Sequence, residues 1–183
     1  MKHTLTPIVL ALTLALTACG KAQETASEKI AEKIIESSIG KDGTQAKVDL
    51  SSGGAKVTTT DADGKTSQFE MGTAKISEAE AGVPFYPGAS MDGNGGTRMT
   101  SPDGTNLMVA LTSTDPADKV SAFYRDKLKP MAEGRQFIDM DSSDGIHVLS
   151  LIDDKAKSSL QVQVQKAEAG SHIQIVSSRG PAK

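Results

Sequence analysis

The segment from Leu160 to Gln165 reads Leu-Gln-Val-Gln-Val-Gln, and this pattern restricts the fold more than any other in the chain. Strict alternation places apolar side chains on one face of a strand and polar side chains on the other. Such a strand belongs in an antiparallel sheet with one buried and one wet face, because the strands of a parallel sheet are apolar on both faces. The sequence therefore predicts a half-buried antiparallel sheet.

The residues around this strand predict the rest of the sheet and one helix. Strands are expected at 97–100, 107–111, 135–141, 146–152, 159–166 and 172–177. The sequence Asp115-Pro116-Ala117-Asp118 predicts a helix start, with an N-cap, a first-turn proline and a carboxylate at the positive helix end. An apolar stripe at helical spacing follows, formed by Ala117, Val120, Phe123, Tyr124 and Leu128. This stripe predicts a helix packed on the sheet.

The first part of the chain predicts a second helix and a three-stranded meander. Thr25-Ala-Ser-Glu28 has the form of a capping box, and a helix over 26–39 is expected with its isoleucines facing a small sheet. Contact of that face with a membrane or a partner is the alternative. Alternation between 45 and 71 predicts the meander, and the Ala-, Glu- and Gly-rich stretch 72–82 is expected to be a linker.

The expected fold class is α+β, with an antiparallel β-sheet and one packed helix in the C-terminal half, preceded by a small helix plus the three-stranded meander. The expected division is a helix-plus-meander subdomain at 25–71, the linker at 72–82, an α+β domain at 83–178 and a C-terminal tail at 179–183.

The N-terminus has the features of a signal peptide over residues 1–18. Lys2 and His3 precede an apolar stretch of about a dozen residues, which is too short to span a bilayer. Leu16-Thr17-Ala18-Cys19 resembles the lipobox of bacterial lipoproteins. The resemblance implies cleavage before Cys19, a diacylglyceryl group on its thiol, and a fatty acyl chain such as palmitate on the new amino terminus. An ordinary secretory signal with a chance cysteine is the alternative.

The same resemblance implies a location. Residue 20 is Gly, whereas in Gram-negative lipoproteins of this type an Asp there favours retention in the inner membrane. We therefore expect a lipid anchor in the outer membrane, residues 19–24 as a tether, and a body facing the periplasm.

A second set of residues resembles small bacterial envelope lipoproteins. Their P-x-Y-P-G-A segment corresponds to Pro84, Tyr86, Pro87, Gly88 and Ala89, and a later motif corresponds to Thr114, Asp115, Val120, Phe123 and Tyr124. These motifs are structural, so the resemblance implies no activity.

Composition and motifs argue against several functions. Twenty basic against 23 acidic residues, without a basic cluster, argue against nucleic-acid binding. With Cys19 taken by lipid, no thiol remains, and the only histidines beyond the signal peptide, His147 and His172, fall short of a zinc site. Neither a nucleophile elbow nor a phosphate-binding loop is present. We expect no enzyme activity, no cofactor and no metal.

The remaining expectation is an interaction or structural module that contacts an envelope protein. The candidate contact surface comprises Tyr86, Asn94 in the glycine-rich loop 92–96, Tyr124 and any free strand edge. We also expect the pairs Phe85-Tyr86 and Phe123-Tyr124 to form one aromatic cluster. The alternative function is a periplasmic carrier or sensor of a small apolar ligand, bound in a groove under the 117–128 helix.

Overall fold

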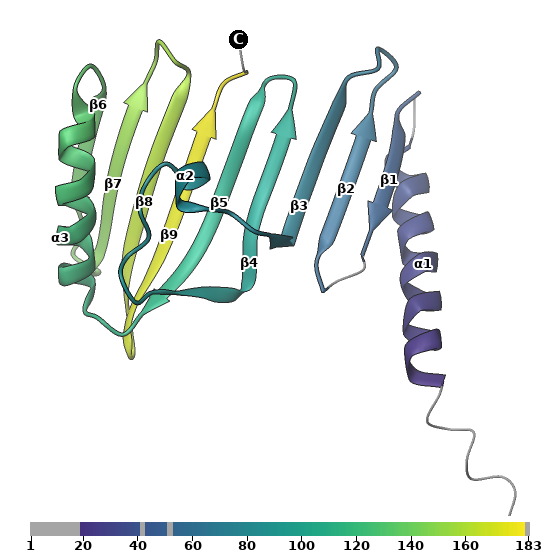
Figure 1. Ribbon diagram of the computed structural model, residues 1–183, viewed down its shortest axis with the longest axis horizontal. Coiled ribbons are helices and arrows are strands. Elements are labelled where there is room, and N and C mark those ends of the chain that lie inside the picture. The colour runs from purple at the N-terminus through teal and green to yellow at the C-terminus, as the bar shows by residue number, and fades with distance from the viewer. Residues whose placement is uncertain (1–18, 41–42, 51–52, 182–183) are drawn as a thin grey trace, which may run out of the picture.

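The computed structural model describes residues 19–40, 43–50 and 53–181, so the expected signal peptide lies outside the described residues. The described chain forms a nine-stranded antiparallel sheet in the order β1-β2-β3-β4-β5-β9-β8-β7-β6, with helices on one face and at one edge (Figure 1). The α+β class is confirmed. The elements are α1 (Cys19–Ile39), β1 (Gln45–Asp49), β2 (Ala55–Thr60), β3 (Thr66–Ala74), α2 (Glu78–Ala81), β4 (Ser90–Ser101), β5 (Gly104–Ser113), α3 (Ala117–Leu128), the 3-10 turn η1 (Lys129–Ala132), β6 (Gln136–Asp141), β7 (Ile146–Asp153), β8 (Ser158–Ala167) and β9 (Gly170–Arg179).

The strand register separates the two faces of the sheet. Cross-strand neighbours on the face that carries α3 include, in order, Glu70, Arg98, Leu107, Ser177, Leu160, Leu151 and Phe137. The row on the opposite face is Met71, Thr97, Met108, Val176, Gln161, Ser150 and Ile138. We call this second side the open face, because no described helix covers it. The glutamines of the Leu160–Gln165 segment lie on the open face, as alternation requires.

The core lies between α3 and the strands beneath it. Val120, Tyr124 and Leu128 of the helix are fully buried. They pack in one cluster with a row of strand residues formed by Val109, Ile175, Val162 and Leu149. Burial of each such side chain stabilises the fold by about 1.5–3 kcal/mol, so this layer holds the helix on the sheet.

Helix α1 differs from expectation in its length, its start and its packing. It begins at Cys19, so residues 19–24, expected as a tether, are helical, and Thr25–Glu28 lies inside the helix instead of capping it. Ile30 and Ile34 are 62% and 60% exposed. The expected burial of the isoleucine face is wrong for these two residues, because α1 runs beside the edge strand β1 rather than across the sheet (Figure 1).

Two segments expected to be irregular belong to the folded body. The expected linker 72–82 contains the end of β3 and all of α2, and it buries Ala74, Ile76 and Ala81 in the core. The expected loop 92–96 lies within β4, where the register shifts between Met91 and Gly96. The two halves of the chain therefore share one sheet.

Candidate functional site

A groove of about 410 Å³ opens on the helix-bearing side of the sheet, between α2 and η1. Its floor contains Leu151 and Leu160, which are nearly buried, beside the hydroxyl of Ser177. Gly82 follows α2 on one side, and Met131 of η1 lies on the other. Apolar atoms thus meet polar ones in a depression large enough for part of a small molecule.

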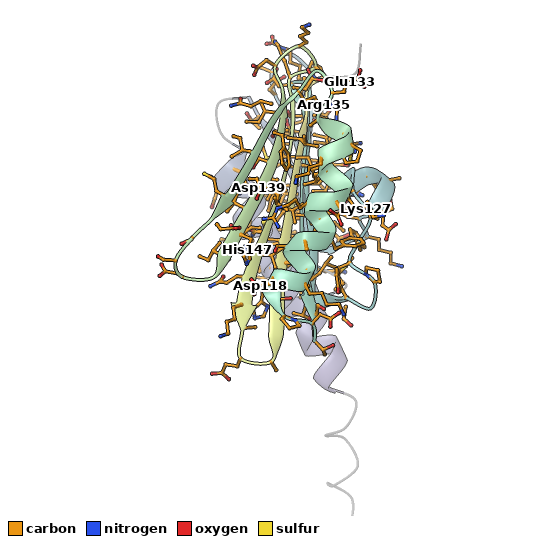
Figure 2. The ribbon with its side chains drawn as sticks, turned by 90° about the vertical axis from the view of Figure 1, so that its left-hand side faces the viewer. Asp118, Lys127, Glu133, Arg135, Asp139 and His147 are labelled. Carbon is orange, nitrogen blue, oxygen red and sulfur yellow. The ribbon has the colours of Figure 1, made fainter. Side chains whose placement is uncertain are left out.

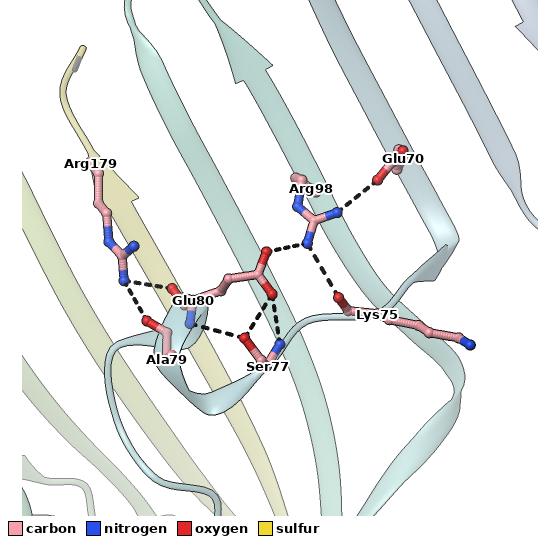
Figure 3. Close-up of polar contacts among 7 residues, drawn as sticks. All are labelled: Glu70, Lys75, Ser77, Ala79, Glu80, Arg98 and Arg179. Atoms are coloured by element: carbon pink, nitrogen blue, oxygen red, sulfur yellow. Dashed lines mark hydrogen bonds and ion pairs between the residues drawn. The ribbon is translucent and has the colours of Figure 1, made fainter.

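The wall at α2 is fastened to the sheet by two arginines (Figure 3). Arg98 on β4 pairs with Glu70 of β3 at 3.0 Å and with Glu80 of α2 at 2.5 Å. Arg179 at the end of β9 donates to the carbonyls of Ala79 and Glu80, at 3.1 and 2.7 Å. These contacts satisfy carbonyls near the end of a single-turn helix that would be unstable alone.

A capping box begins the same helix. The Ser77 amide donates to the Glu80 carboxylate, and the Glu80 amide donates to the Ser77 hydroxyl. The hydrogen bond from the Ser77 amide, then that from its hydroxyl, lowers the pKa of Glu80, and the Arg98 charge acts in the same direction. Glu80 is therefore a carboxylate at neutral pH and a strong partner for Arg98.

The opposite side of the groove carries a third arginine. The Nε atom of Arg135 lies 3.6 Å from the Asp153 carboxylate, and both residues line the groove. Arg135 and Arg179 therefore place two guanidinium groups at the rim of an otherwise mixed surface. Guanidinium groups bind carboxylates and phosphates through paired hydrogen bonds.

The space under α3, by contrast, is filled. Tyr124 is fully buried, and its hydroxyl accepts a hydrogen bond from the Tyr86 amide at 3.1 Å. Burial raises the pKa of the Tyr124 hydroxyl. Phe123 makes edge-to-face contacts with both tyrosine rings, at centroid distances of 5.2 and 5.1 Å. Three members of the expected aromatic cluster, Tyr86, Phe123 and Tyr124, are in ring contact, and Phe85 packs against the same core. Buried side chains fill the expected groove under the middle of the helix, and a pocket of about 450 Å³ opens at its first turn, beside Ala117, Asp118 and His147.

This packing also removes two of the residues expected on a contact surface. Tyr86 is 7% exposed, so neither Tyr86 nor Tyr124 presents a surface to a partner. Asn94 lies in β4, and its side chain is outside the described part of the structure. Cys19 is the first residue of α1, and its side chain is likewise outside the described part.

Asp115 has a different role from the expected N-cap. Pro116 occupies the N-cap position, and the Asp115 carboxylate accepts hydrogen bonds from the Tyr86 hydroxyl at 2.6 Å and from the Lys119 ammonium at about 3 Å. The Tyr86 hydrogen bond, followed by that from Lys119, lowers the pKa of Asp115. The carboxylate thus joins the extended segment before β4 to the start of α3.

The arginines and serines of the groove were not predicted as site residues. Leu160 and Ser177 are cross-strand neighbours, but Arg135 and Arg179 come from the ends of separate strands and meet only in the folded chain. The Ser77-Glu-Ala-Glu80 pattern is a capping-box signature and was the one local signal that could have located α2.

Two features are absent among the described residues. These residues contain no group of three or more metal-ligating side chains placed to hold an ion. No helix among them is long and apolar enough to cross a membrane.

Comparison with known proteins gives one similarity. A family model described as START domain-like matches residues 91–174, which cover most of β4 through the first half of β9 and include α3. No curated protein and no solved structure matches the chain.

Proposed function

We propose that this protein is a binding module for a small amphipathic ligand, which it holds in the groove between α2 and η1. The observation that carries the proposal is the composition of that groove. An apolar floor of Leu151 and Leu160 lies next to the guanidinium groups of Arg135 and Arg179. A ligand with an apolar chain and an anionic head matches both parts.

The family similarity supports a binding role. START domain-like modules are usually binding modules, and the match favours an apolar ligand over a purely structural role. Most of the groove residues, including Met131, Arg135, Leu151 and Leu160, fall within the matched range 91–174. The proposal keeps the carrier or sensor expected from the sequence but moves its site from under α3 to beyond the end of that helix.

The location remains a proposal of its own. The lipobox resemblance at Leu16–Cys19 supports a lipid anchor in the outer membrane with a periplasmic body. Two or more acyl chains would make the attachment stable. Substitution Cys19→Ser followed by membrane fractionation tests this: the account expects an unprocessed chain, and a variant still processed in the outer membrane would overturn it.

The ligand-binding proposal is tested by calorimetric titration of residues 19–183 carrying Cys19→Ser, produced without the signal peptide, with decanoate and with decyltrimethylammonium. Decanoate is expected to bind more tightly, because the guanidinium groups of Arg135 and Arg179 outnumber the single carboxylate of Asp153 in the groove. Ser158→Trp fills the groove and should abolish binding. Ser150→Trp is the matched control, since Ser150 lies on the open face of the adjacent strand and should leave binding intact. Equal binding by both variants would contradict the proposed site.

A second function, the protein-interaction module, is favoured by the open face. Met71, Met99 and Met108 are 39–50% exposed and lie close together across β3, β4 and β5. Exposed methionines adapt to partners of different shape. This function would use a surface on the far side of the sheet from the groove, so the two proposals can be tested separately.

A further inference from the structure

The two edge strands of the sheet, β1 and β6, differ in whether their outward-facing backbone groups are hydrogen-bonded. At β1, the amides of Val48 and Leu50 donate to the carboxylates of Glu36 and Glu32 on α1, both at 2.8 Å. Helix α1 therefore satisfies donors that would otherwise be open to another strand. Protection of this kind is how proteins prevent pairing between sheet edges.

The opposite edge, β6, has no such protection in the described part of the chain. The Ser142 amide donates to the Ile146 carbonyl at 2.8 Å in the turn that joins β6 to β7. Hydrogen bonding alternates along an antiparallel pair, so the backbone groups of Phe137, Asp139 and Asp141 point away from β7. Strand β6 thus presents a row of backbone donors and acceptors.

On the α3 side of this edge, Asp139 of β6 and His147 of β7 lie near Asp118 at the start of α3 (Figure 2). Arg125 binds both oxygens of Asp139 at 2.6 and 2.9 Å and thereby lowers the pKa of Asp139. Asp141 and Asp118 both approach the His147 ring, at 2.6 and 3.1 Å, and they remain 59% and 93% exposed. The carboxylates of Asp118, Asp139 and Asp141 outnumber the permanent positive charges of Arg125 and of Lys129, which also acts on Asp139.

The other side of β6 is apolar. Ile138 and Met140 lie on the open face beside Ser150 and Val148 of β7, and Met140 is 56% exposed. A strand added next to β6 would therefore meet carboxylates on one of its faces and apolar side chains on the other. A second copy fits less well, because two β6 strands paired about Asp139 would set like charges opposite each other.

We propose that the free edge of β6 binds an extended segment of a partner protein in which basic and apolar residues alternate. Main-chain hydrogen bonds to the edge supply affinity, and the alternate side chains supply specificity. The basic residues face Asp139 and Asp141, and the apolar residues lie over Ile138 and Met140. This inference is independent of the ligand groove.

The test uses the full chain and the blocked peptide Ser-Lys-Val-Lys-Val-Lys-Val-Ser, with hydrogen exchange measured at individual amides. The peptide should slow exchange at Phe137, Asp139 and Asp141 and leave the capped amides of Val48 and Leu50 unchanged. A peptide with glutamate in place of lysine is the matched control and should bind about tenfold more weakly, since charge complementarity provides the specificity.

A charge reversal separates recognition from misfolding. Asp141→Lys should weaken binding of the lysine peptide about tenfold and strengthen binding of the glutamate peptide. An unfolded variant would not show that gain in binding. No protection of β6 by the lysine peptide, or equal binding of both peptides, would overturn the proposal. Protection of β6 without peptide, together with a doubled mass in sedimentation, would also overturn it and would identify a second copy as the occupant.

Discussion

The backbone amide of Tyr86 donates a hydrogen bond to the hydroxyl of Tyr124, 38 residues later in the chain. The bond is buried and joins the proline-fixed segment before β4 to the centre of α3. Phe123 packs against both rings, and the Asp115 carboxylate accepts a hydrogen bond from the Tyr86 hydroxyl. Residues of the extended segment and of α3 therefore form one packed cluster, which holds α3 on the sheet.

Removal of the Tyr124 hydroxyl should destabilise the fold. Tyr124→Phe leaves the buried Tyr86 amide without its acceptor, and the expected loss in free energy of unfolding is about 1–3 kcal/mol. Urea denaturation followed by circular dichroism measures this loss. Tyr86→Phe keeps the hydrogen bond from the Tyr86 amide to Tyr124 and removes only the partly buried hydrogen bond to Asp115. The loss in free energy of unfolding should therefore be smaller. A larger loss for Tyr86→Phe would contradict this assignment.

The Arg125–Asp139 pair predicts a loss of stability in acid. Because Arg125 lowers the pKa of Asp139 below its ordinary value of 3.8, the unfolded chain binds a proton more readily than the folded chain. The stabilisation from this ion pair is fully present above pH 3.8. It disappears as the pH falls through the lower pKa that Asp139 has in the folded chain. Asp139→Asn should therefore reduce stability at pH 7 and differ progressively less from the native chain below pH 3.8. A constant difference down to pH 2 would contradict the linkage.

The cap on the β1 edge predicts a local effect. Glu36→Ala removes the acceptor of the Val48 amide and should lower stability by about 1 kcal/mol. Hydrogen exchange at Val48 should become faster, with Val162 in the core as the reference. Lys33→Ala on the exposed side of α1 is the control and should leave exchange at Val48 unchanged. Similar acceleration in both variants would show that the carboxylate does not protect this edge.

The close packing of β4 against Ile76 and Ala74 predicts that a side chain at position 96 destabilises the fold. A Cβ atom there would lie 2.5 Å from Cδ1 of Ile76 and 3.0 Å from the Ala74 carbonyl oxygen. Gly96→Ala should cost about 1–3 kcal/mol through overpacking. A Cβ atom at Gly93 meets no atom within 4 Å, so Gly93→Ala is the matched control. Thermal unfolding of the two variants should separate them clearly, and equal melting temperatures would refute the close approach.

Local sequence signals predicted the second half of the chain better than the first. Alternation around Leu160 is a property of neighbouring residues, so it identifies a half-buried strand without knowledge of the fold. The apolar stripe of α3 works in the same way, and its members Val120, Tyr124 and Leu128 are all buried. The α+β class follows from these two patterns.

The errors arose where distant contacts decide the structure. Ile30 and Ile34 are spaced for burial, yet α1 uses Glu32 and Glu36 to cap a strand edge and leaves both isoleucines exposed. The stretch 72–82 has the composition of a linker, but Arg98 and Arg179 fasten α2 to the sheet from positions far along the chain. The groove follows from that same placement, which no local pattern encodes.

The most direct test of the proposed function is an amide chemical-shift titration of residues 19–183 carrying Cys19→Ser, produced without the signal peptide, with decanoate. We expect saturable shifts concentrated at residues that line the groove, such as Gly82, Ser158 and Ser177, with little change at Gln163 and Gln165. Shifts concentrated at those two glutamines, or no saturable shift at millimolar decanoate, would contradict it.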